Sequence, residues 1–177
     1  IADGGAGLAA AAAGSSASGA VQVTSESTVT NVGGLFGSAR VAASASSSTG
    51  VILVTAASDN SFVGGLIGAN VGQLTDVFSD SVMGVTLNDF GGGAGTNAAV
   101  GGLVGDNRGG VTRAFATGDV GVTNPAENSA QVGGLIGYNQ GTATDTYATG
   151  AVSHTGNTLF RGIVGGHTGL NDATIAN

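Results

Sequence analysis

The chain has 177 residues, with glycine at 35 positions, no cysteine and a formal net charge of −7. Lysine is absent and only four arginines occur, so the acidic surface would repel a phosphate backbone, which argues against nucleic-acid binding. The lack of cysteine excludes disulfides, thiol catalysis and thiolate metal sites. The longest apolar run near the start, residues 8–13, is too short to cross a bilayer, so no membrane insertion is expected.

A six-residue glycine box recurs along the chain. It reads VGGLFG at 32–37, VGGLIG at 63–68, VGGLVG at 100–105 and VGGLIG at 132–137. We assign degenerate copies to IADGGA at 1–6 and to FRGIVG at 160–165. A period of this length is typical of repeat proteins. The sequence therefore predicts a single repeat domain over 1–177, with units 1–31, 32–62, 63–99, 100–131 and 132–159 and a partial unit 160–177.

The predicted elements are short strands. Alternation in residues 19–30 indicates a strand in the first unit. In the second unit, the run VILVT at 51–55 predicts a strand that is buried on both faces. The third unit is lengthened by NDFGGGAGTN at 88–97, which indicates a loop. No segment has a helical period with caps, so each unit is expected to hold about three strands.

These features predict an all-β fold, a parallel β-solenoid (β-helix) with about one coil per repeat of roughly 31 residues. Neighbouring coils would stack about 4.8 Å apart, and the commoner right-handed winding is expected. A propeller is the alternative, but each blade needs four strands and roughly 40–50 residues.

Stacking would turn each repeat position into a column of side chains. The box leucines, aligned with Ile163, predict one buried aliphatic column: Leu35, Leu66, Leu103 and Leu135. Val51, Val120 and Val152 predict a second apolar column.

An asparagine follows the box by two residues at Asn70, Asn107 and Asn139, and the same count reaches His167 in the last unit. The amide can bond from coil to coil, and asparagine tolerates the left-handed backbone of a corner. We interpret the column as a structural ladder; a binding row is the alternative.

Phe78, Phe115 and Tyr147 share another repeat position. Aromatic residues at a fixed position predict a core stack, with a sugar-stacking strip as the alternative. Tyr138 falls outside this column and is expected to be exposed.

Asp76, Arg113 and Asp145 also share a position, eight residues after the box. In register they would form a column of alternating charge on a solvated face, which would specify the coil register rather than catalyse a reaction.

No catalytic, cofactor-binding or metal-binding residues are predicted. The two histidines, His154 and His167, lie in different parts of the repeat, so a shared metal site is not expected. No serine, histidine and acid grouping follows from the spacing, so the segment is not expected to be an enzyme. Threonine is abundant, but no sustained Thr-x-Thr column is predicted across the coils.

The unit resembles the GLUG repeat, named for its Gly-Leu-(aliphatic)-Gly core. The resemblance rests on residues 65–68, 102–105 and 134–137, the Asn-x-Gly corner that follows, and Ala-Thr-Gly at 116–118 and 148–150. It covers about residues 32–155 and is lost in the first and last units. Such repeats occur in large secreted bacterial surface and adhesin-like proteins, so the resemblance implies secretion and display at the cell surface and carries over no catalytic residues.

The sequence predicts a structural function, a repeat segment of an extracellular surface or matrix protein that stacks into a stalk or a head-to-tail filament. The alternative is an adhesin module that binds a glycan or a host surface protein along one solenoid face. Its candidate residues are Tyr138, Arg108, Asp89 and Phe90. A lyase-like enzyme is a weaker third possibility.

Overall fold

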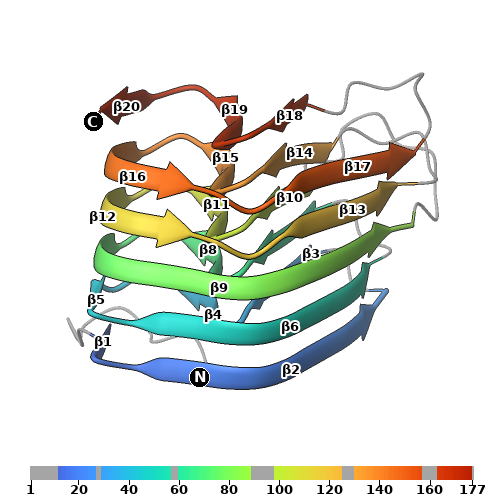
Figure 1. Cartoon of the computed structure of the whole chain (residues 1–177), viewed down its shortest axis with the longest axis horizontal. Coiled ribbons are helices and arrows are strands. Elements are labelled where there is room, and N and C mark those ends of the chain that lie inside the picture. The colour runs from blue at the N-terminus through green and yellow to red at the C-terminus, as the bar shows by residue number, and fades with distance from the viewer. Residues whose placement is uncertain are drawn as a thin grey trace.

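The computed structural model describes residues 12–26, 29–56, 60–88, 98–124, 130–156 and 163–176. These residues form twenty β-strands and no helix. The described strands belong to three sheets, and every strand pair is parallel (Figure 1). The predicted all-β parallel solenoid is therefore confirmed.

Two five-stranded sheets hold the strands on either side of the glycine box. The sheet before the box contains β3 (Val29–Gly33), β7 (Asn60–Gly64), β10 (Ala98–Gly101), β14 (Ala130–Gly133) and β18 (Ile163–Gly165). The sheet after the box contains β4 (Phe36–Ala39), β8 (Ile67–Asn70), β11 (Val104–Asn107), β15 (Ile136–Asn139) and β19 (Thr168–Asn171).

The third sheet, here called the broad sheet, holds the remaining ten strands. Its first part contains β1 (Ala12–Ala13), β2 (Ser16–Ser25), β5 (Ala43–Ser44), β6 (Ser47–Ala56) and β9 (Gln73–Leu87). Its second part contains β12 (Gly110–Ala116), β13 (Val120–Asn124), β16 (Thr142–Ala148), β17 (Val152–Gly156) and β20 (Thr174–Ala176).

The winding of the coils can be followed in Figure 1. The long strands β2, β6 and β9 run from left to right at the front, and the chain returns behind them from right to left as it rises from the N-terminal to the C-terminal end. This is a right-handed solenoid, as expected.

The second glycine of the boxes at 32–37, 63–68, 100–105 and 132–137 is required by the stacking. A Cβ on Gly102 would lie 2.1 Å from the carbonyl oxygen of Gly134 in the next coil. The same clash, at 2.0 Å, would occur between Gly65 and Gly102. Because the obstacle is backbone in both cases, no side-chain movement can relieve it. At these box positions the backbone of the next coil therefore occupies the space that a side chain would need.

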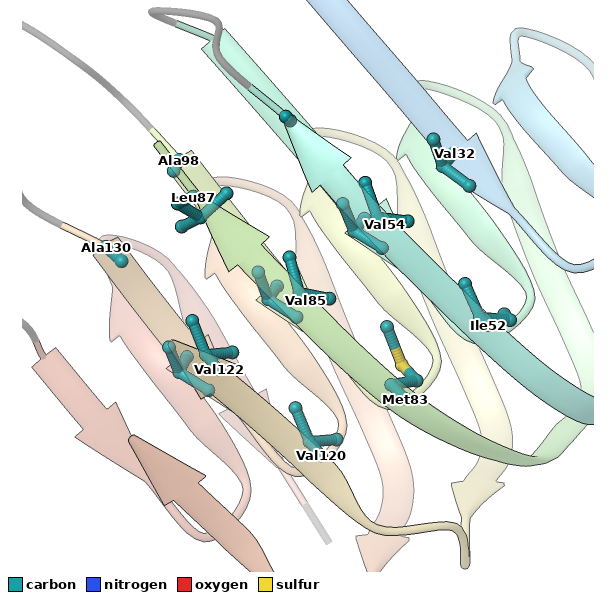
Figure 2. Close-up of a cluster of buried hydrophobic side chains, with 14 residues drawn as sticks. Val32, Ile52, Val54, Met83, Val85, Leu87, Ala98, Val120, Val122 and Ala130 are labelled. Atoms are coloured by element: carbon teal, nitrogen blue, oxygen red, sulfur yellow. The ribbon is translucent and has the colours of Figure 1, made fainter. Parts of the chain in front are cut away.

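The core consists of two buried apolar clusters. One lies between the broad sheet and the sheet before the box, and Figure 2 shows its side chains pointing into this space from β6, β9 and β13. The other contains the box leucines, of which Leu66, Leu103 and Leu135 are fully buried. Leu35, in the second coil, is only half-buried and packs against this cluster.

The strand pairing corrects the alignment of the last unit. Val132 and Gly133 pair with Val164 and Gly165, so the last box is VGGHTG at 164–169 rather than FRGIVG at 160–165. His167, and not Ile163, occupies the leucine position. Histidine and threonine replace the two aliphatic residues of this box, which is why the box pattern alone favours residues 160–165.

The run at 51–55 is not buried on both faces. Ile52 and Val54 point into the core, whereas Val51 and Leu53 are 42% and 48% exposed. The second apolar column is therefore continued by Ile52, Met83, Val120 and Val152, and the assignment of Val51 to it was wrong by one residue. A shift of one residue moves a strand side chain to the opposite face.

We predict that Gly102→Ala destabilises the protein by about 3 kcal/mol or more, because the added Cβ meets a backbone carbonyl that cannot move alone. The matched control is Gly121→Ala on β13, where the nearest atom to a new Cβ is 3.4 Å away. Chemical denaturation of both variants tests this: equal stability for the two would contradict the packing argument.

Candidate functional site

The asparagine column lies inside the solenoid and is bonded from end to end. Asn70 Nδ2 donates to Asn107 Oδ1 at 2.8 Å, and Asn107 Nδ2 donates to Asn139 Oδ1 at 2.7 Å. The corrected register adds Asn171, whose Oδ1 accepts from Asn139 at 2.7 Å. The three predicted members are at most 1% exposed. A buried column that satisfies its own amides is structural and offers nothing to a ligand.

The charged column lies on the surface at a corner of the coil. Arg113 donates to both oxygens of Asp76, from Nε at 2.6 Å and from a terminal guanidinium nitrogen at 2.8 Å. The hydrogen bond with Arg113 lowers the pKa of Asp76, and the same bond raises the pKa of Arg113. Asp145 acts on Arg113 through longer-range attraction. The column is built as an ion pair and not as an acid–base pair in a cleft.

The same position has a left-handed backbone in five successive coils. Gly14 has a φ of 62°, and the side-chain-bearing residues Ala45, Asp76, Arg113 and Asp145 have φ between 47° and 56°. Only the first of these is glycine, although left-handed backbone costs other residues roughly 1–2 kcal/mol. The corner of the coil is thus set by position rather than by residue type.

The aromatic column stacks as predicted but lies on the outside, so the prediction of a core stack was wrong. The ring centroids of Phe78 and Phe115 are 5.0 Å apart, and those of Phe115 and Tyr147 are 5.1 Å apart, with planes within 5°. The phenylalanines are half-buried and Tyr147 is 51% exposed. Because the rings cover one another's faces, the column presents ring edges to solvent, which is a poor geometry for sugar stacking.

The outer face of the broad sheet carries a column that sequence reasoning missed. Five threonines pair in register across five coils: Thr24, Thr55, Thr86, Thr123 and Thr155. All are exposed except Thr86, which is half-buried. The signal was present in the sequence, because each threonine stands eighteen residues after the end of its box. The neighbouring outward positions vary from coil to coil.

Exposed apolar side chains lie beside this threonine column. Val51, Leu53 and Val82 are between 42% and 50% exposed on β6 and β9. Two carboxylates border them: Asp80 accepts from Thr117 Oγ1 at 2.7 Å, and Asp119 accepts from the Ala151 amide at 2.8 Å. We call this face, with its threonines, apolar residues and acids, the outer face of the broad sheet.

The predicted ligand-binding residues are only partly brought together. Tyr138 is half-buried on β15; its hydroxyl donates to Asp172 at 2.7 Å and accepts from Gln140 at 2.9 Å. Arg108 is exposed and donates from Nε to Asp106 Oδ2 at 2.9 Å. Asp106 and Tyr138 pair in adjacent strands. Asp89 and Phe90 lie outside the described residues.

Asp106 is the member of this group that sequence reasoning did not single out. It is 2% exposed, and its Oδ1 has no hydrogen-bond partner among the described residues. Burial raises the pKa of Asp106, and Arg108 opposes this shift. The bond with Asp172 is the main cause of a raised Tyr138 pKa. The presence of an arginine two residues after the aspartate, at 106 and 108, was the signal that could have found it.

The described residues contain no cluster of metal-ligating side chains. No three histidine, aspartate or glutamate side chains within those residues are close enough to hold a metal ion. A hollow of about 410 Å³ is bordered by apolar residues of β2 and β3, and its described lining has no titratable side chain. The described part of the chain also contains no apolar helix of membrane-spanning length.

Comparisons with known proteins give no family. No protein-family model, no curated protein and no solved structure matches the chain. The resemblance to the GLUG repeat stays a prediction.

We predict that Arg113→Glu lowers the melting temperature slightly, because it places three acidic side chains in one column and removes the pairing with Asp76. The control Arg113→Gln removes the pairing without adding repulsion. Its melting temperature should lie between those of the unaltered protein and Arg113→Glu. The difference between the Glu and Gln variants should shrink in high salt. An unchanged melting temperature for Arg113→Glu at low salt would show that the column does not set the register.

Proposed function

We propose that this chain is a structural repeat segment of a secreted surface or matrix protein, which stacks its coils into a stalk or a head-to-tail filament. The single observation that supports this most strongly is the set of columns that run from coil to coil. Asparagine amides, aromatic rings and glycine carbonyls each contact the same residue type in the next coil. Such a molecule resists bending and unravelling along its axis.

The stability of such a rod comes from the contacts between neighbouring coils. Each coil donates backbone hydrogen bonds to the next, as when the Leu66 amide bonds the Leu103 carbonyl at 2.9 Å. Stability in repeat proteins is a sum of intrinsic and nearest-neighbour terms. The rod can therefore be lengthened without a new kind of contact, which suits a spacer or a shaft.

The outermost described strands support association along the axis. Among the described strands, β2 pairs only with β6, and β17 pairs only with β13. The free edge of a strand is a template for another strand. We propose that these edges receive further coils, from the same chain or from another copy.

We predict that the purified protein at high concentration forms fibres whose diffraction has a layer line near 4.8 Å, measured by electron microscopy. Tyr147→Lys should shorten or abolish the fibres, because it places a charge at the upper end of the described aromatic column. The matched control is Thr123→Lys, which adds the same charge on the outer face and should leave fibres intact. Short monodisperse particles for the unaltered protein would contradict the filament and favour the stalk.

A second function is favoured by the outer face of the broad sheet. The threonine column persists through five coils although it contributes nothing to the core, and exposed apolar side chains lie beside it. Such a surface suits an adhesin that binds a hydroxyl-rich glycan or a host surface protein. Because the stacked rings cover most of one another's faces, binding would use the threonines and apolar residues instead of ring stacking.

We predict for this second function that Thr123→Lys reduces binding on a glycan array severalfold, because a long cation interrupts the threonine column. Thr112→Lys is the matched control: Thr112 lies in the same coil but in a separate, shorter threonine column with Thr75 and Thr144, before the corner at Arg113. Equal losses for both variants, or no retained glycan for the unaltered protein, would contradict an adhesive outer face.

A further inference from the structure

The last described coil breaks the leucine column with a histidine. The His167 carbonyl accepts from the amides of Leu135 at 2.8 Å and Ile136 at 3.1 Å. One coil below, the Leu135 carbonyl accepts from Leu103 and Val104 at 2.8 and 3.0 Å. The backbone contact is thus repeated closely, while the side chain changes from aliphatic to titratable.

The imidazole of His167 lies against two hydroxyls at the end of the apolar core. Its Nε2 is 3.0 Å from Thr146 Oγ1, and its Nδ1 is 2.8 Å from Thr168 Oγ1. Thr146 is buried, and the corresponding residue one coil below is the buried Ala114. Thr168 pairs with Ile136 and thus continues an aliphatic position. The three substitutions occur together, so the polar group is accommodated as a unit.

Among the residues that the structure describes, no carboxylate forms an ion pair with this ring. The strands β10, β14, β18 and β19 contain no titratable residue. On β16, Asp145 and Tyr147 are exposed, and on β15 the Tyr138 hydroxyl is bonded to Asp172. On β17, the only titratable residue is His154, which is not an acid. An imidazolium here would be half-buried without a carboxylate partner.

We propose that His167 makes the attachment of the last described coil, residues 163–176, dependent on pH. The neutral ring packs at the end of the leucine column and holds this coil on the one below it. A proton on the ring adds a charge that is better solvated when the coil is released. Acidification therefore loosens residues 163–176 and exposes the upper edges of β14, β15 and β16.

The direction of the pH dependence follows from the burial. Burial lowers the pKa of His167 below its ordinary value of 6.5, and a hydrogen bond with the backbone of Thr146 partly opposes the shift. The released coil binds the proton more readily than the attached one. The stabilisation from the neutral ring is then fully present above pH 6.5 and is lost as the pH falls through the lower pKa of the attached state.

Amide hydrogen exchange of the intact chain tests this, because the Leu135 and Ile136 amides report on the bonds to His167. Their protection factors should fall below pH 6.5, by up to about tenfold per pH unit for one coupled proton. The Leu103 and Val104 amides make the same bonds one coil below and serve as internal controls that should not change. An equal fall at all four amides, or no fall at any, would overturn the proposal.

Two variants distinguish the effect of His167 on the pH dependence from that of His154. His167→Leu restores the residue of the four preceding boxes and should keep Leu135 and Ile136 protected at low pH. His154→Gln is the matched control and should leave the pH dependence as it is. Loss of the dependence in His154→Gln instead would overturn the assignment. Should His167→Leu fold poorly, NMR titration of the His167 ring in the unaltered protein decides: a pKa at or above 6.5 contradicts the proposal.

Discussion

The parallel pairing of each coil with the next is the constraint on which the rest of this structure depends. It places equivalent residues of successive coils one strand spacing apart, about 4.8 Å, so every residue must tolerate a neighbour like itself. Asparagine meets this condition by donating to and accepting from its own kind, and stacked phenyl rings meet it through contact of their faces. Glycine meets it where a backbone carbonyl occupies the space of a side chain. Stacked like charges would repel one another, and the charged column accordingly alternates in sign where its members pair.

Much of this architecture could be predicted from the sequence because stacking repeats its requirements. The box glycines, the asparagines and the acid–arginine position recur at fixed spacing, and each has a physical reason to recur. The last box escaped detection because His167 and Thr168 replace its aliphatic residues, although its glycines remain in register. Spacing alone could not choose between two glycine-rich candidates four residues apart.

It was harder to predict which residues of the broad sheet face the core, because one residue at the corner of each coil has a left-handed backbone. Alternation places Leu74 inward and would place Phe78 inward as well. The left-handed backbone at Asp76 resets this alternation, so Val77 is buried and Phe78 points outward. Because this position holds glycine, alanine, aspartate or arginine, its residue type gives no sign of a left-handed corner. The aromatic column was therefore assigned to the wrong side of the sheet, while its stacking was anticipated correctly.

The third coil is longer than its neighbours but keeps their register, which shows where such a chain tolerates insertions during evolution. Its box and the next are 37 residues apart instead of 31, yet Gly101 still pairs with Gly64 on one side and Gly133 on the other. The additional residues are accommodated between the end of β9 and the start of β10 without shifting any later column. Insertions between these two strands thus leave the pairing of the later strands in register, whereas one inserted residue inside a box would exchange inner and outer faces. Gene segments that encode whole coils can accordingly be duplicated, lost or lengthened between these strands independently of their neighbours.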